Sequence, residues 1–223
     1  MKEKNEWERL LSAQIIFQSN FPECVLVGGT AAALHASHRT SMDADHVHPH
    51  LKERFAEILK KVEEEAGWHT KKLEPPVLIL GNFQGVRTGI RQLIRSQPLE
   101  TTIVRGLKIP TSEEILRIKG ALIVKRNATR DFIDFTALFD HLGVNRSLEA
   151  LDSLDILYPQ EGEASVSQQL ALQLAEPKPW DLSQTDLSNY RSLQAPYTDW
   201  KEIKRRLYAA AQKLIERRLQ AES

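Results

Sequence analysis

The chain has 223 residues, of which 41% are hydrophobic and 27% charged, a composition typical of an ordinary globular protein. It excludes a disordered tail, a collagen-like fibre and a disulfide-stabilised scaffold. The 30 lysines and arginines balance 30 aspartates and glutamates. Because no global positive field attracts nucleic acid or an anionic membrane, any nucleic-acid contact requires a local patch.

Cysteine usage and hydropathy predict a cytoplasmic protein. The single cysteine, Cys24, begins an apolar run and is interpreted as a buried, reduced thiol. The longest apolar stretch, 24–38, is too short to span a bilayer, and the densely charged start of the chain is unlike a signal peptide. We therefore expect no membrane partner.

Hydrophobic periodicity predicts an α/β protein, in the broad sense that includes α+β, with a small mixed and twisted sheet of about four or five strands. The helices expected in the first half cover 6–19, 31–38 and 51–66. The strands expected there cover 24–27, 43–48, 77–80, 86–94 and 102–104. Helices are expected to pack on this sheet.

The second half of the chain is predicted to be helical. Thr111 and Glu114 form a capping box that starts a helix, and a second helix over 130–142 ends at Gly143. We assign 1–143 to a core domain and 144–223 to a helical C-terminal region. Within that region, 158–197 is expected to be a loop-rich connector around one helix over 167–175, and a final helix covers 198–220.

The most informative segment is a short strand, a Gly28-Gly29-Thr30 turn, a small-residue helix and then Asp43-Ala44-Asp45. Residues two apart on a strand point to one face, so Asp43 and Asp45 are expected to lie side by side. Two carboxylates at that spacing suit Mg²⁺, which adds water and phosphate oxygens as ligands. Backbone N–H groups and the Thr30 hydroxyl could hold phosphate oxygens. The alternative is a tight turn followed by two solvated aspartates.

This ordered pattern resembles the DNA polymerase β-type nucleotidyltransferase superfamily. The downstream segment, Lys119-Gly120-Ala121-Leu122, then Arg126, then Arg130-Asp131-Phe132-Ile133-Asp134, is similar to the AbiEii/AbiGii-type bacterial toxin nucleotidyltransferases. The resemblance covers about 21–143. It implies the nucleotidyltransferase fold, a divalent cation (Mg²⁺ or Mn²⁺) and a nucleoside triphosphate (NTP) as substrate.

The resemblance also implies roles for individual residues. Asp43 and Asp45 would bind the metal, and Lys119 would act with them in catalysis. The nucleotide would be bound by Gly28, Gly29, Thr30, Arg39, Ser41, Arg126, Arg130 and Asp131. Asp131 or Asp134 would order the basic side chains, although Arg130 and Asp134 could equally form a structural ion pair. Lys119 is expected on the exposed side of its helix, so that its removal would hardly change stability.

One feature departs from the superfamily pattern, which usually has a third acid on a neighbouring strand. The strand over 86–94 offers Gln92 at the position where that acid is expected, and Glu100 lies beyond Pro98. Two carboxylates give the metal less charge and leave the attacking group without an obvious base. The missing acid leaves the expected fold unchanged but counts against catalytic activity.

Histidines form a second pattern. His46, His48 and His50 alternate along the strand, on the face opposite Asp43 and Asp45. Three imidazoles could bind Zn²⁺ or Ni²⁺, but Pro49 interrupts the strand and no fourth ligand follows. Structural or surface histidines are the favoured interpretation.

The favoured function is a Mg²⁺-dependent nucleotidyltransferase. The family resemblance implies a toxin of a toxin–antitoxin or phage-defence system, with RNA such as a tRNA end as one acceptor and, where the system includes one, a cognate antitoxin as partner. One alternative is a small-molecule nucleotidyltransferase of the aminoglycoside-modifying kind. Another is a catalytically silent relative that binds nucleotide or a partner protein. The acceptor and the oligomeric state stay open at this point.

The final helix is basic and carries an apolar stripe formed by Trp200, Ile203, Leu207 and Leu214. Its basic residues are Lys201, Lys204, Arg205, Arg206, Lys213, Arg217 and Arg218. They are interpreted either as a solvated face on a helix that docks through its apolar stripe or as a local patch for an RNA acceptor.

Overall fold

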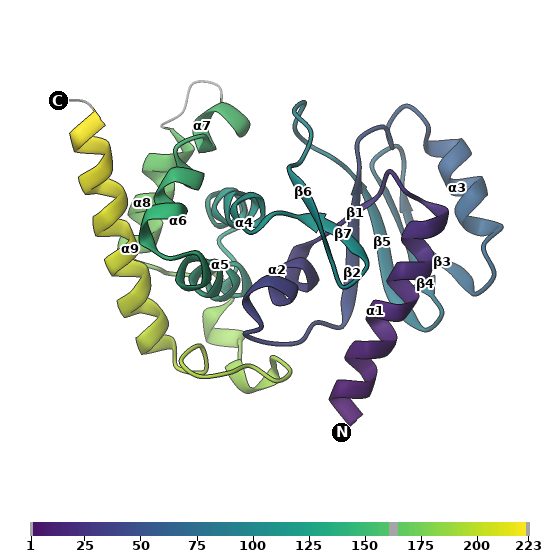
Figure 1. Cartoon of the computed structure of the whole chain (residues 1–223), viewed down its shortest axis with the longest axis horizontal. Helices are drawn as coiled ribbons and strands as arrows, with labels where there is room; N and C mark the ends of the chain where they lie inside the picture. Colours follow the sequence, from purple (N-terminus) through teal and green to yellow (C-terminus); the bar gives the residue numbers. More distant parts are fainter. Residues whose placement is uncertain (1, 161–164, 222–223) are drawn as a thin grey trace. The chain divides into compact units, whose positions relative to one another are not determined.

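The computed structural model describes residues 2–160 and 165–221 (Figure 1). Two compact units divide the chain. Unit 1 comprises Met1–Leu34 and Thr40–Thr111, and unit 2 comprises His35–Arg39 and Ser112–Ser223. Each is described here by itself.

A mixed sheet forms the centre of unit 1. In the described residues its five strands have the order β1-β2-β5-β4-β3. Their bounds are Val25–Val27 (β1), Asp43–His48 (β2), Trp68–Glu74 (β3), Leu78–Phe83 (β4) and Val86–Gln92 (β5). β2 and β5 are parallel, and the other neighbours are antiparallel. The sheet confirms the predicted mixed topology, and β2 has the predicted bounds.

Two hairpins of unit 1 turn through residues with positive φ. Gln84 and Gly85 (φ 51° and 83°) join β4 to β5. Arg105 and Gly106 (φ 52° and 81°) join β6 (Thr101–Val104) to β7 (Leu107–Pro110), a separate two-stranded sheet. Such turns match the right-handed twist of the strands that they connect. β3 and β7 were not predicted from the sequence.

Helices cover one face of the five-stranded sheet. α1 (Lys2–Asn20) and α3 (Phe55–Glu63) lie on the same side of it (Figure 1). Phe17 of α1 is fully buried, and its ring stacks 6.1 Å from Trp68 and meets Phe83 edge-on at 5.4 Å. Burial of these rings supplies much of the apolar driving force that holds α1 on the sheet. Cys24 is buried as predicted, and burial raises its pKa to about 12.

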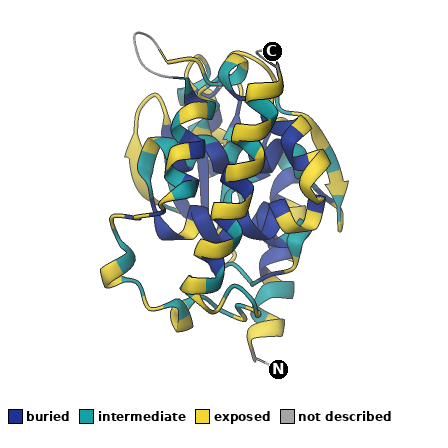
Figure 2. Cartoon of the chain, turned by 90° about the vertical axis from the view of Figure 1, so that its left-hand side faces the viewer, coloured by how far each residue is buried: buried dark blue, intermediate teal, exposed yellow. Residues whose placement is uncertain are grey.

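Unit 2 is helical in its described part. Its helices are α4 (Ser112–Arg126), α5 (Thr129–Leu142), α6 (Val144–Leu151), α7 (Leu154–Leu157), α8 (Val166–Ala175) and α9 (Trp200–Ala221). Their inward residues are buried and their outward residues exposed (Figure 2). α5 is buried along most of its length, and Phe132 and Phe135 are inaccessible to solvent. α4 starts directly after Thr111, as its capping signal predicted.

The boundary of unit 2 differs from the boundary expected at residue 143. α4 packs against α6 and α8, and α5 packs against α9, so both helices belong to the C-terminal unit. Contact is close at Gly120, where an added Cβ would lie 3.0 Å from Leu170 Cδ2. The sequence indicated that a helix ends at Gly143, but it did not indicate that α4 and α5 pack against the helices that follow.

The segment 177–199, here called the strap, joins α8 to α9. It contains two short 3₁₀ helices, Leu182–Gln184 and Leu187–Asn189. The expected connector over 158–197 therefore has local structure around α8, which lies within one residue of its predicted bounds. Residues 161–164 of that prediction lie outside the described residues.

Candidate functional site

The turn between β1 and α2 (Gly28–Ala36) requires glycine. Gly28 starts α2 with a φ of +72°, a left-handed conformation that side chains rarely adopt. A Cβ there would lie 3.6 Å from Oδ2 of Asp45. The predicted Gly28-Gly29-Thr30 motif therefore does open a helix at the end of a buried strand, and its backbone passes close to the second aspartate.

Thr30 has a different contact from the one predicted. Its side chain is buried, and Oγ1 donates a hydrogen bond of 2.6 Å to the backbone carbonyl of Asp43. Ser41 Oγ lies 3.4 Å from the same carbonyl oxygen. The Thr30 hydroxyl proton is therefore used to fix the start of β2. Phosphate binding by Thr30 stays a prediction.

Asp43 and Asp45 share one face of β2, as predicted, and their side chains are 50% and 41% exposed. The parallel register pairs Asp43 with Arg87, Asp45 with Gly89 and Val47 with Arg91. Arg87 Nη1 lies 3.7 Å from Asp43 Oδ2, and Arg91 Nε lies 3.5 Å from Asp45 Oδ1. We call the four charged side chains Asp43, Asp45, Arg87 and Arg91 the aspartate–arginine face.

The Asp45 carboxylate lies between two glycines. Besides its approach to Gly28, its Oδ1 is 3.2 Å from the position that a Cβ at Gly89 would take. That distance is shorter than an ordinary van der Waals contact, so position 89 accommodates glycine best. The sequence analysis did not single out Gly89, Arg87 or Arg91, because only the strand register brings them to the aspartates.

The expectation for Gln92 was wrong. The register pairs it with His48, not with an aspartate. Its amide accepts a hydrogen bond of 2.7 Å from Lys52 N and donates one of 2.7 Å to the Pro49 carbonyl. Glu100 precedes β6 and lies outside the five-stranded sheet. Neither residue supplies a third acid on the face of Asp43 and Asp45.

The two aspartates suit a divalent cation as donors. They are hard oxygen ligands on one exposed face, and Mg²⁺ characteristically takes one or two carboxylates together with water and phosphate oxygens. In residues 2–160 and 165–221, no three His, Cys, Asp or Glu side chains are gathered as a complete protein-made metal site. A cation held by Asp43 and Asp45 would therefore keep water molecules or other ligands from solution in its remaining positions.

The histidines of β2 lie on the opposite face. His46 and His48 are buried, and the His46 ring lies 5.0 Å from that of Phe17. Burial lowers the pKa of His46 to about 4, which keeps the imidazole neutral near pH 7. His48 Nδ1 accepts a hydrogen bond from the backbone N–H of His50 in the following turn. These contacts are structural.

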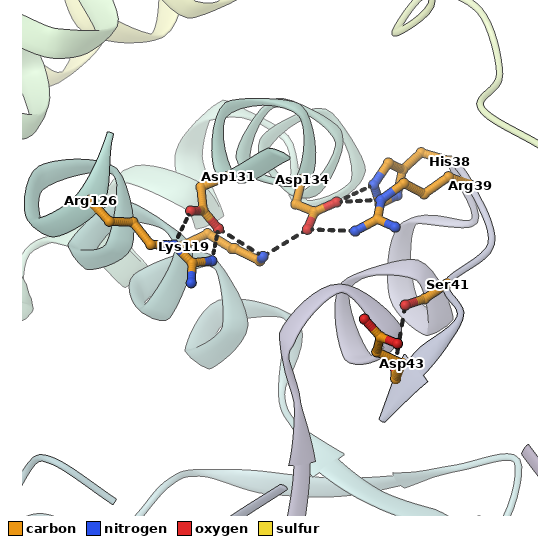
Figure 3. A network of polar contacts seen from close by, with 8 residues as sticks. All are labelled: His38, Arg39, Ser41, Asp43, Lys119, Arg126, Asp131 and Asp134. Atoms are coloured by element: carbon orange, nitrogen blue, oxygen red, sulfur yellow. Dashed lines mark hydrogen bonds and ion pairs between the residues drawn. The ribbon is translucent and has the colours of Figure 1, made fainter. Parts of the chain in front are cut away.

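A second charged cluster lies inside unit 2 and is centred on Asp134 (Figure 3). Arg39 donates two hydrogen bonds to its carboxylate, from Nε at 2.8 Å and Nη2 at 3.0 Å. Lys119 Nζ lies 2.7 Å from Oδ2, and His38 Nε2 lies 2.8 Å from Oδ1. Burial raises the pKa of Asp134, but Arg39, Lys119 and His38 together hold it well below its usual range.

Asp131 extends this cluster by one turn of α5. It accepts hydrogen bonds from Lys119 Nζ at 3.0 Å, Arg126 Nε at 2.5 Å and Arg126 Nη2 at 2.8 Å. Its pKa is lowered by Lys119 and Arg126 in spite of burial. In Figure 3, Lys119 lies between the two carboxylates. We call His38, Arg39, Lys119, Arg126, Asp131 and Asp134 the buried network.

The buried network corrects two expectations. Lys119 is 1% exposed and bridges two buried carboxylates, so it is not on the exposed side of α4. Asp134 pairs with Arg39 and Lys119, whereas Arg130 is exposed. Helical spacing alone could not identify these partners, because Arg39 comes from a segment 95 residues away.

The strap makes several contacts close to the buried network. The Tyr190 ring lies 5.8 Å from Arg39 Cζ, and the backbone N–H of Gln194 donates to the His38 carbonyl at 2.9 Å. Asp181 Oδ1 accepts hydrogen bonds from the backbone N–H and the hydroxyl of Thr129, at the start of α5. The strap therefore holds the ends of α5 and of the 35–39 segment.

The basic residues of α9 are largely neutralised. Arg205 and Arg206 pair with Glu202, and Arg206 also lies 2.8 Å from Asp140. Lys213 pairs with Glu216, and Arg217 with Asp152. Ile203 and Leu207 are buried, as predicted for a docked helix. The contacts favour the interpretation as a docked helix with a solvated face, and RNA binding by α9 stays a prediction.

Comparison with solved structures identifies the fold. A proposed nucleotidyltransferase from Helicobacter pylori has a TM-score of 0.61 and 17% identity over all of this chain and 99% of that one. JHP933, also from Helicobacter pylori, has a TM-score of 0.60 and 16% identity over all of this chain and 96% of its own. The chain therefore has the fold of these nucleotidyltransferase-like proteins, as its motifs predicted. Membership of the AbiEii/AbiGii family stays a prediction.

Sequence comparison points to a different set of proteins. The heme uptake protein MmpL11 of Mycobacterium tuberculosis is 36% identical over 129 residues, and the mycolic acid-containing lipids exporter MmpL11 of Mycolicibacterium smegmatis is 33% identical over 129. The match covers 55% of this chain but 13% of those relatives. No family model matches the chain. In the described residues, no helix combines the length and the apolar character that crossing a membrane requires.

Proposed function

We propose that the protein is a divalent-cation-dependent nucleotidyltransferase that transfers a nucleotidyl group from an NTP to an acceptor hydroxyl and releases pyrophosphate. The observation that carries this proposal is the exposed pair Asp43 and Asp45 beside the left-handed Gly28 turn, in a chain with the fold of nucleotidyltransferase-like proteins. Asp43 and Asp45 would hold Mg²⁺ or Mn²⁺. The cation would polarise the phosphates and neutralise charge on the leaving pyrophosphate.

The protein's own groups have separate tasks in this proposal. Gly28 and Gly29 let the backbone approach phosphate oxygens at the start of α2, where N–H groups point outward. Thr30 and Ser41 position Asp43 through its carbonyl. As the family resemblance implies, Arg39, Arg126 and Arg130 would meet anionic groups of the nucleotide; Arg130 is exposed and the Arg126 side chain is 36% exposed, whereas Arg39 is largely buried against Asp134. Lys119 and Asp131 would support these arginines from within the buried network.

The acceptor we propose is an RNA end, and the biological role that of a toxin controlled by an antitoxin. The aspartate–arginine face supports an anionic acceptor, because Arg87 and Arg91 lie beside both carboxylates. The arginines leave this face without the net negative charge that would attract a cationic aminoglycoside, which disfavours the small-molecule alternative.

A catalytically silent nucleotide-binding protein is the second candidate. The observation that favours it is that β5 presents Arg87, Gly89 and Arg91, and no acid, beside Asp43 and Asp45. This candidate predicts NTP binding without transfer, and the two proposals therefore differ in a single assay.

The test is transfer of label from each of the four α-³²P-labelled NTPs to total RNA, in the presence of Mg²⁺ or Mn²⁺. We expect label on RNA with the wild-type chain and none with the double variant Asp43→Asn/Asp45→Asn. Asp152→Asn is a matched control, because Asp152 is also an exposed aspartate beside an arginine, Arg217. Binding without label transfer for all four nucleotides would favour the silent protein, and absence of cation-dependent binding would contradict both.

A further inference from the structure

The strand beside Asp43 and Asp45 presents no acid on their face, because β5 has Arg87, Gly89 and Arg91 there. The Cα partner of Asp45 on β5 is Gly89. A Cβ at this position would lie 3.2 Å from Asp45 Oδ1 and 3.3 Å from Leu80 Cδ1. Both distances are shorter than ordinary contacts between such atoms. A side chain at position 89 would therefore require Asp45 or Leu80 to shift, so the sheet as packed favours glycine over an acid there.

Two arginines lie on the same face, two residues before and two residues after Gly89. This placement follows from the two-residue period of a strand. The ion-pair distances of 3.7 Å for Arg87 and 3.5 Å for Arg91 are longer than hydrogen bonds, and the two side chains are 61% and 49% exposed. The guanidinium groups thus balance the charge of the aspartates without a direct hydrogen bond to them, so their N–H groups can bind another anion.

The charge of this face limits how many cations it can hold. The two guanidinium groups balance the two carboxylates before any metal is bound. One divalent cation leaves the face positive enough to hold a polyphosphate. A second would place two more positive charges beside two arginines with no further carboxylate to balance them, which Coulomb repulsion opposes.

We propose that the aspartate–arginine face holds a single divalent cation and that Arg87 and Arg91 bind phosphate oxygens of the nucleotide in place of a second cation. This inference rests on the proposed function. Arginine suits the task because its planar fork matches phosphate oxygens and its charge is permanent. Two-metal sites use their second cation to neutralise charge on the phosphates, and here side chains of β5 take that role.

The experiment uses Mn²⁺ and a non-hydrolysable NTP analogue with the full chain. Electron paramagnetic resonance of free Mn²⁺ counts the cations bound per chain, and calorimetry measures the dissociation constant of the analogue. We expect one Mn²⁺ per chain at saturation. In the double variant Arg87→Gln/Arg91→Gln, Mn²⁺ alone should bind more tightly, because the competing guanidinium groups are gone.

The same variant should bind the analogue less tightly in the presence of Mn²⁺. We expect the dissociation constant to rise roughly tenfold or more, since charged hydrogen bonds to phosphate are lost. The two affinities therefore change in opposite directions, whereas a merely structural role would weaken both. Arg105→Gln is the matched control, because Arg105 is also 49% exposed and pairs with one carboxylate, Glu8.

Two Mn²⁺ per chain, or an unchanged dissociation constant for the analogue in the double variant, would overturn the inference. In either case the proposed function survives if binding of the analogue still depends on the cation and is lost in Asp43→Asn/Asp45→Asn. If the wild-type chain binds neither Mn²⁺ nor the analogue, the proposed function and the inference both fail.

Discussion

The aspartate–arginine face of unit 1 and the buried network of unit 2 contain the same kinds of side chain in opposite environments. Asp43 and Asp45 are about half exposed and have arginines at 3.5–3.7 Å. Asp131 and Asp134 are fully buried and have cations at 2.5–3.0 Å. Loose, hydrated pairs contribute little to stability but leave their charges available to a ligand, whereas buried pairs must be complete for the fold to be stable.

The largest effect is expected for Asp134→Ala. Removing this carboxylate leaves Arg39 and Lys119 without their shared partner in the interior, and loss of one member of a buried pair typically costs about 3–5 kcal/mol. Urea unfolding at neutral pH measures the free energy of unfolding. Asp140→Ala is the control, because Asp140 is exposed and its pair with Arg206 is solvated. Equal losses of stability in Asp134→Ala and Asp140→Ala would mean that the buried network is no more sensitive than an exposed ion pair.

Lys119→Met should lower the free energy of unfolding by about 3 kcal/mol, because Asp131 and Asp134 both lose the ammonium group that bridges them in the interior. The sequence alone predicted almost no change, since Lys119 was placed on the exposed side of α4. Lys125→Met is the control on the same helix, where the lysine is exposed. Equal melting temperatures for Lys119→Met and Lys125→Met would mean that Lys119 behaves as an exposed lysine and contributes little to stability.

Acid should weaken unit 2 through the same carboxylates. The folded pKa values of Asp131 and Asp134 lie below the ordinary 3.8, so their stabilisation is fully present above that pH. It is lost as the pH falls below about 3.8 and through the lower folded values, because the unfolded chain then binds more protons. Urea midpoints at pH 5, 4 and 3 should therefore converge for wild type and Asp134→Asn. A constant difference at all three values would argue against the assigned ion pairs.

Asp181→Ala should have a smaller effect, about 1 kcal/mol, because it removes a cap that the strap places on the start of α5. Asp186→Ala is the comparison, since Asp186 accepts a bond within its own turn, from Ser188 N. Hydrogen exchange at the first turn of α5 should rise in Asp181→Ala and not in Asp186→Ala. Unchanged exchange in both would mean that the strap does not stabilise α5.

The smallest change in stability is expected for Asp43→Asn, under about 0.5 kcal/mol, as for other exposed substitutions. The same variant should lose cation-dependent binding of NTP, because an amide is a poor ligand for Mg²⁺. Thermal shift with and without Mg²⁺ and NTP separates the two effects. A large loss of stability without ligand would make this aspartate structural, like Asp134.

The sequence predicted most of unit 1 because its signals are local. The strand of Asp43 and Asp45 and the glycine turn before it depend on neighbouring residues. β3 was missed because it is an edge strand whose residues after Trp68 are largely exposed, so that no alternation marks it. The glycine of the Arg105-Gly106 turn is a local signal for the β6–β7 hairpin.

The partners of the site residues could not be predicted in the same way. Arg87 and Arg91 lie beside the aspartates because of the parallel register of β2 and β5. Arg39 pairs with Asp134, which is 95 residues away in the sequence. Such pairings depend on tertiary packing, which leaves no fixed spacing in the sequence. The charge of the candidate site, unlike its motif, was therefore visible only in the structure.

The return of the 35–39 segment to unit 2 has a consequence for how the chain is made. All residues of unit 1 have been synthesised once the ribosome reaches position 111. The ion pair of Arg39 with Asp134, and the hydrogen bond of the His38 carbonyl with Gln194 of the strap, can form only after those later residues have been synthesised. Unit 1 can therefore fold first during translation, before His38 and Arg39 meet their partners in unit 2. A fragment that starts at position 112 would lack both of them and would bury Asp134 with Lys119 as its remaining cation, so cutting the gene at this boundary should yield an insoluble product.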